Sequence, residues 1–430
     1  MKPVNIGGHA AYQKHVLEQL CKYYPNALTS FDSATWDIME QFWSLDLSPV
    51  DDLMRDRYSV FGPEPRLPSS MLRSYLLSIK CKVTSITAWA SDLKQNHLHA
   101  ILSGFSVGDT PGTGTFYDFF DRLWLSDSDN ISNPVHPPRQ KPKKPDKKGK
   151  KAPSVEKVTV YDLLARFETE PPKDFAPAAR LFEIFKSQFL DVSVNQGLIN
   201  LDNLAVSGDG TPVYTGARER KTRTCGCLEK GIRDCKCDRI YHQPDCNTGW
   251  DSHRERHYFG YGLYTLTASD SENDLPLFPL LGPASRHDSH GFWYNFFSMK
   301  QFLPQANVTK LLLDSAHDAM AYYQYCSEHG IKPFIDLNGK GGRPPVYKDD
   351  FTLGDDGVPV CREGFRMRLD GTEPSKGRTK FKCPRISFAG GSPACTCPHP
   401  CSDAKYGRTV HLVLKDNPRL FNDPPRCSKE

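Results

Sequence analysis

The sequence lacks any long hydrophobic run. None of its 430 residues lies in a stretch that approaches the roughly 20 apolar residues of a membrane-spanning helix. The N-terminal stretch MKPVNIGGHAAYQKH has no apolar segment of the kind that a secretory signal requires. We therefore expect a cytoplasmic protein that makes no contact with a membrane.

The sequence also has no strong excess of charge of one sign and no shortage of apolar residues. Its net charge is +4, and 38% of its residues are hydrophobic, which is enough for a sizeable core. The length favours two or three domains. The 14 cysteines gather in C-x-C pairs, and without a secretory signal this spacing favours thiolate metal ligands over disulfides.

Residues 1–134 are expected to form a helical domain. Apolar residues recur with helical spacing in 12–24 and 35–45, and further helices are expected to begin near residues 68, 84 and 113. Two interpretations stay open: a bundle whose aromatic residues are core, or a helix-turn-helix-like unit that binds DNA. The second would use the basic residues of the middle helices, namely Arg55, Arg57, Arg66, Arg73, Lys80, Lys82 and Lys94.

Residues 135–158 have almost no apolar side chains and are rich in proline and lysine. Such a segment cannot bury a core, so we expect an extended linker between domains. It is either a solvated tether or a contact for DNA phosphates. The lysines that would make this contact are Lys143, Lys144, Lys147 and Lys148.

Two apolar segments each lead to an aspartate. The stretch LAVSGDGTPVY, residues 204–214, predicts a strand, a small-residue turn that carries Asp209, and the start of a second strand. Gly208 and Gly210 would leave room for an anionic ligand. The second segment, LLLDSAHD, ends its apolar run at Asp314. Two carboxylates at strand ends predict a divalent-metal pair over a sheet. The basic residues after Asp209 would hold a polyanion or form a solvated loop: Arg218, Arg220, Lys221 and Arg223.

The cysteines form two candidate zinc sites. The first group is Cys225, Cys227, Cys235 and Cys237, for which unpaired cysteines in a loop are the alternative. The second is Cys361, Cys383, Cys395, Cys397 and Cys401, within an insertion at 339–406 that has few apolar residues and would need a metal to hold it together. Both metals would be structural.

The pattern of residues 159–338 predicts helices at 159–201, followed by three strands, a helix, a strand, a helix and a strand. This order, with Asp209 on the first strand and Asp314 on the fourth, resembles the RNase H-like core of DDE transposases. LPSSMLRSYLLSIKCKVTSITAWASDLKQN and TFYDFFDRL are similar to the N-terminal domain of insertion-sequence transposases, and GDGTPVY, GPASRHDS, LLLDSAHD and YGRTVHL to the rest of that prokaryotic group. The resemblance implies an α+β protein: a helical domain, then an RNase H-like mixed α/β sheet domain with a cysteine-rich insertion.

The resemblance also implies a function. Mg²⁺ or Mn²⁺ ions held by Asp209, Asp314 and a third carboxylate would cut double-stranded DNA at the terminal inverted repeats of a mobile element and join the ends to target DNA. The enzyme would be a homo-oligomer associated with the nucleoid. The third carboxylate would be a glutamate on a helix after a return strand at 408–414, within a last segment at 407–430.

No such helix is recognisable after the return strand, and Glu430 is not assigned the role, so we expect a chain truncated before the third carboxylate. The alternatives are therefore an inactive transposase that acts as a DNA-binding protein or repressor, and a metal-dependent nuclease. His287, Asp288 and His290 in the HDSH motif are expected to serve turn and capping roles rather than bind a metal, and the alternative is a contact to DNA or a support of the metal ligands.

Overall fold

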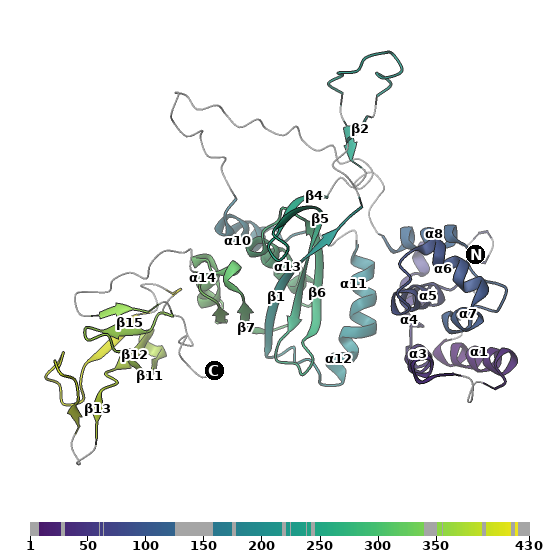
Figure 1. The fold of residues 1–430 in the computed structure, drawn as a ribbon. Helices are drawn as coiled ribbons and strands as arrows, with labels where there is room; N and C mark the ends of the chain where they lie inside the picture. The colour runs from purple at the N-terminus through teal and green to yellow at the C-terminus, as the bar shows by residue number, and fades with distance from the viewer. Residues whose placement is uncertain are drawn as a thin grey trace. The chain divides into compact units, whose positions relative to one another are not determined.

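The structure, a computed structural model, is a mixed α and β protein that divides into two compact units (Figure 1). The first comprises Met1–Ser132 and Asp174–Gln196, and the second comprises Asn133–Lys173 and Gly197–Glu430. The described residues are 8–26, 31–59, 61–62, 64–124, 158–173, 178–216, 221–223, 225–237, 239–241, 246–338, 351–354, 356–388, 393–413 and 418–419. No helix among them is long and apolar enough to cross a membrane.

The first unit is helical, as predicted. Its core gathers large apolar side chains from several helices, among them the fully buried Trp89 and Phe116. Its helices are α1 (Gly8–Tyr23), α3 (Ser33–Ser44), α4 (Pro49–Leu53), η1 (Arg55–Arg57), α5 (Pro68–Lys80), α6 (Ile86–Gln95), α7 (His97–Ser103), α8 (Thr113–Leu123), α11 (Ala179–Phe185), η3 (Lys186–Leu190) and α12 (Asp191–Asn195).

The basic residues expected to face DNA are partly used inside this unit. Arg73 is only 2% exposed, and its guanidinium lies 3.6 Å from the ring centre of Tyr12. Arg66 forms an ion pair with Asp109. The assignment of Arg73 to a DNA-contacting surface is therefore wrong, because its charge is buried against an aromatic ring within the fold.

Of the helices predicted at 159–201, only the first lies in the unit that contains the sheet. Helix α10 (Val160–Thr169) packs on α13 (Asp288–Phe302), where the Phe167 ring centre lies 4.8 Å from that of Tyr294. Residues 174–196 belong to the first unit instead. There Ile184 enters the helical core, which is why this segment departs from the predicted domain boundary.

The second unit is built on a six-stranded mixed sheet with the order β4-β5-β1-β7-β8, in which β6 also pairs with β5. Strand β1 is antiparallel to β5 and parallel to β7, and β8 is parallel to β7. The aromatic face of α13 packs against α14, where the Trp293 and Tyr322 ring centres lie 4.7 Å apart. The elements are β1 (Leu204–Tyr214), β4 (Asn247–Asp251), β5 (Arg256–Ala268), β6 (Leu275–Pro283), β7 (Val308–Leu313), η4 (Ser315–His317), α14 (Met320–Glu328) and β8 (Lys332–Ile335).

The turn predicted around Asp209 is wrong, because β1 runs without a break through all 11 residues of LAVSGDGTPVY. Its residues from Val206 to Tyr214 pair in continuous antiparallel register with β5. That long-range pairing satisfies the backbone of the glycine-rich stretch, which local sequence would otherwise place in a turn.

The cysteine-rich part forms small sheets of its own. The strand predicted to return to the main sheet, β15 (Thr409–Val413), pairs instead with β12 (Arg378–Lys382). That prediction is wrong because Val410 and Leu412 are buried with Phe381 in a local apolar core. The other strands are β9 (Phe351–Leu353), β10 (Pro359–Cys361), β11 (Arg368–Glu373), β13 (Ile386–Ser387) and β14 (Ala394–Cys395), with the short helix η6 (Pro374–Lys376).

Candidate metal sites

The two predicted aspartates belong to neighbouring parallel segments, with Asp209 within β1 and Asp314 directly after β7. Strands β1 and β7 pair with Val206 opposite Leu311 and Ser207 opposite Leu312. Two residues further along each chain, the same register brings Asp209 beside Asp314. Neighbouring strands lie about 4.8 Å apart, so both carboxylates leave the backbone at the same edge of the sheet. Both residues are exposed there.

A buried hydrogen-bond chain orients Asp314. The Nδ1 of His317 lies 2.6 Å from Asp314 Oδ1, and its Nε2 lies 2.7 Å from the hydroxyl of Tyr264. Burial raises the pKa of Tyr264 well above its usual value, so its hydroxyl stays protonated and donates to Nε2. The Nδ1–H of His317 then donates to the carboxylate, and this hydrogen bond lowers the pKa of Asp314. Asp314 is thereby held ionised and in one orientation.

A third carboxylate, Asp288, lies within the electrostatic influence of these two, and the sequence analysis had not assigned it to a metal site. It is the first residue of α13. Burial is the largest influence and raises the pKa of its carboxyl group. The charges of His317 and His287 lower this pKa, and those of Asp209 and Asp314 raise it. The three aspartates also raise the pKa of the same tyrosine, Tyr264. The capping role predicted for the HDSH motif is carried by His287, which accepts a hydrogen bond from the amide of Ser289.

The glycines beside Asp209 make room for protein groups rather than for a ligand. A Cβ at Gly208 would lie 2.8 Å from the Tyr264 ring, and one at Gly210 would lie 2.3 Å from Asp288 Oδ1. The predicted space for a bulky anion at these glycines is therefore filled by the Tyr264 ring and the Asp288 carboxylate.

Two further aspartates lie near this edge. The register of β7 and β8 sets Leu313 opposite Ile335, so the exposed Asp336 follows β8 where Asp314 follows β7. The side chain of Asp318 is fully buried and bonds Arg419 at 2.7 Å. Asp318 thus ties the chain after β15 to the β7–α14 connection.

The described residues whose metal-ligating atoms all lie within 4.8 Å of one another are cysteines, and the aspartates do not meet that distance. A Mg²⁺ site at these aspartates therefore stays a prediction.

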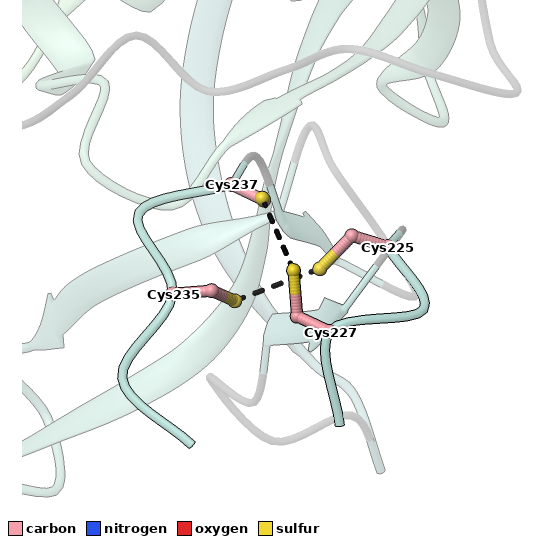
Figure 2. Close-up of side chains that lie close together, drawn as sticks. All are labelled: Cys225, Cys227, Cys235 and Cys237. Carbon is pink, nitrogen blue, oxygen red and sulfur yellow. Dashed lines mark hydrogen bonds between the residues drawn. The ribbon is translucent and has the colours of Figure 1, made fainter. Parts of the chain in front are cut away.

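The first cysteine group comes together as the sequence predicted. Cys225, Cys227, Cys235 and Cys237 point toward one another from the loop between β2 (Lys221–Arg223) and β3 (Arg239–Tyr241) (Figure 2). Hydrogen bonds from Cys227 lower the pKa of Cys225 to about 7, whereas the neighbouring thiols raise that of Cys227. One thiolate thus forms readily among neighbours that donate to it, and the group can hold a metal such as zinc.

The second group is brought together in part. Cys383, Cys395 and Cys397 have ligand atoms within 4.8 Å of one another. Burial, and then the neighbouring thiols including Cys361, raise the pKa of Cys397 to about 11. The predicted ligands Cys361 and Cys401 are electrostatic neighbours of this group without belonging to the set of three.

Most of the predicted DNA-binding residues lie outside the part of the chain that the structure describes. Lys221 and Arg223 lie on β2, and their side chains are not described. The remaining ones, and Glu430, lie outside the described residues: Lys143, Lys144, Lys147, Lys148, Arg218 and Arg220. The contact of these residues with DNA stays a prediction.

Comparisons with known proteins identify no relative for this chain. No protein-family model matches it, and neither does a curated protein or a solved structure.

Proposed function

We propose that the chain cleaves and joins DNA strands in the manner of a DDE transposase, with divalent metal ions at Asp209, Asp314 and Asp288. The observation that carries the proposal is that Asp209 on β1 and Asp314 after β7 lie close enough to Asp288, at the start of α13, for their charges to raise its pKa. Carboxylate oxygens are the ligands that Mg²⁺ and Mn²⁺ prefer. Like charges gathered this closely repel one another, and divalent cations relieve that repulsion.

The topology supports the same proposal. The sequence resemblance to an RNase H-like core depends on three strands, a helix, a strand, a helix and a strand, and the second unit contains β1, β5, β6, α13, β7, α14 and β8 in that order. Strands β1 and β7 are adjacent and parallel, so the end of β7 that leads to Asp314 lies beside the part of β1 that leads to Asp209. Strand β4 and the hairpin β2–β3 lie between β1 and β5 in the chain and have no counterpart in the predicted order of elements.

Each residue has a distinct task in the proposed reaction. Bound Mg²⁺ ions would activate the attacking oxygen of water or of a DNA 3′ end and stabilise the departing one. Asp209 and Asp314 would hold the ions from the sheet edge, and Asp288 would hold them from the helix. His317 keeps Asp314 ionised and oriented through its bond to Tyr264, and so acts as a positioning residue.

The test is cleavage and joining of a DNA fragment that carries the sequences flanking the coding region, with Mg²⁺ or Mn²⁺. We expect the chain to cut this DNA, and Asp209→Asn, Asp314→Asn and Asp288→Asn to lose cutting while still binding, since phosphate contacts supply most of the affinity. Asp270→Asn, in the turn after β5, is the matched control and should keep full activity.

Other outcomes separate the alternatives. Binding without cleavage by the unaltered chain would favour a DNA-binding protein or repressor, and cleavage without joining would favour a nuclease. Unchanged cleavage by Asp209→Asn would refute the proposed site. Loss of activity in Asp336→Asn, but not in Asp288→Asn, would move the third ligand from α13 to the end of β8.

A further inference from the structure

The loop at 225–237 folds without a core of its own. All of its residues are half-buried or exposed, and even its large apolar side chains, Leu228 and Ile232, are 61% and 51% exposed. A segment that buries so little apolar surface cannot offset the entropy lost when it adopts one conformation. Some other interaction must therefore hold it.

The backbone of this loop returns on itself so that its two C-x-C pairs face each other. The Ile232 amide donates to the Cys227 carbonyl at 2.8 Å, and the Gly231 amide donates to the Leu228 carbonyl at 3.0 Å. Gly231 adopts a φ of +75°, a conformation that most side chains would disfavour. This turn carries the chain from the first pair of cysteines back to the second.

The sulfur atoms have the spacing of a tetrahedral metal site. All four lie within 4.8 Å of one another, with 3.5 Å between those of Cys225 and Cys235 and 3.7 Å between those of Cys227 and Cys237 (Figure 2). Zinc–sulfur bonds of about 2.3 Å place the sulfurs of a tetrahedral site about 3.8 Å apart. A disulfide would need about 2.05 Å.

We propose that Cys225, Cys227, Cys235 and Cys237 bind one Zn²⁺ ion and that this ion holds the loop in its fold. Four thiolates in a tetrahedron favour Zn²⁺ and leave no position open for a substrate, so the ion is structural. This loop lies in the part of the chain that connects β1 to β4, two strands of the six-stranded sheet. The proposal stands on these residues and does not depend on the proposed DNA chemistry.

Zinc content of the full chain, purified under reducing conditions, tests the site. The double variant Cys235→Ser/Cys237→Ser should contain one zinc ion per chain fewer than the unaltered protein. Cys21→Ser, which removes an exposed cysteine from α1, is the matched control and should leave the zinc content unchanged. Equal zinc in the double variant and the unaltered chain would overturn the proposal.

A second measurement uses the unaltered protein and tests the zinc site even if the double variant does not fold. Lys230, Arg233 and Lys236 are trypsin sites within the loop. In the unaltered protein we expect trypsin to spare them while zinc is bound, to cut them after a chelator removes it, and to spare them again once Zn²⁺ is restored. Cutting at these sites that is the same with and without zinc would contradict the proposal.

Discussion

At the scale of the residue, the candidate active site contains a position where an added side chain would displace a carboxylate. Gly210 lies directly after Asp209, and its missing Cβ makes the space into which the Asp288 carboxylate fits. On the neighbouring strand, a Cβ at Gly262 would meet nothing within 4 Å. Two glycines of the same sheet thus differ in what a methyl group would disturb.

Gly210→Ala should therefore impair the site more than the fold. The added methyl group must displace the Asp288 carboxylate, and a shift of this kind at a metal site should lower metal-dependent cleavage by about tenfold or more. The free energy of unfolding, measured with urea, should fall by about 1–3 kcal/mol at most.

Gly262→Ala is the control for that substitution and should leave both cleavage and stability close to those of the unaltered chain. Full cleavage activity in Gly210→Ala would show that the position of Asp288 does not matter to the reaction.

At the scale of the element, helix α5 begins without a capping side chain of its own and takes a cap from α4. Its N-cap residue, Leu67, offers no side-chain acceptor. The buried carboxylate of Asp51 instead accepts hydrogen bonds from the amide of Ser69 at 2.7 Å and from its hydroxyl at 2.9 Å. Burial raises the pKa of Asp51 in spite of these bonds. The carboxylate joins two helices and satisfies an N-terminal amide that α5 cannot pair internally.

Asp51→Ala should lower the stability of the helical unit by about 2–3 kcal/mol, because it leaves buried donors without an acceptor. The neighbouring Asp52→Ala removes an exposed carboxylate that pairs with Arg55, and should cost about 0.5 kcal/mol or less. Urea unfolding followed by circular dichroism compares the two. Equal effects would mean that the cap on α5 contributes nothing.

At the scale of the whole molecule, the chain crosses between its two units more than once. It leaves the helical unit after residue 132, contributes α10 to the second unit, and returns for residues 174–196 before it enters the sheet. Ile184 from this returning segment is 4% exposed within the helical core, and Arg180 bonds Asp56 at 2.8 Å. The helical unit is therefore incomplete without a segment that lies beyond the linker.

Ile184→Ala should consequently destabilise the helical unit by about 2–4 kcal/mol through the cavity that it leaves. Val192→Ala, at a position in the same segment that is 44% exposed, should change stability by about 0.5 kcal/mol or less. Hydrogen exchange followed by mass spectrometry assigns the loss to a unit. Faster exchange confined to the sheet, with the helices of residues 8–124 unchanged, would contradict the placement of this segment.

Much of the local structure could be predicted because it follows from short-range patterns. Helical spacing located α1 and α3, and apolar runs that lead to an aspartate located β1, which contains Asp209, and β7, which Asp314 follows. The C-x-C pairs marked the first cysteine group, since two ligands two residues apart can reach one ion in almost any loop.

The sequence by itself therefore determined most of the helices and the apolar strands near Asp209 and Asp314, because these depend on periodicity and composition within a few residues. Only the tertiary structure decided which partners they meet. It brought Asp288 to the two aspartates, buried Arg73, paired β15 with β12 and assigned residues 174–196 to the helical unit. Each of these outcomes depends on contacts between residues far apart in the chain, and short-range patterns contain no information about such contacts.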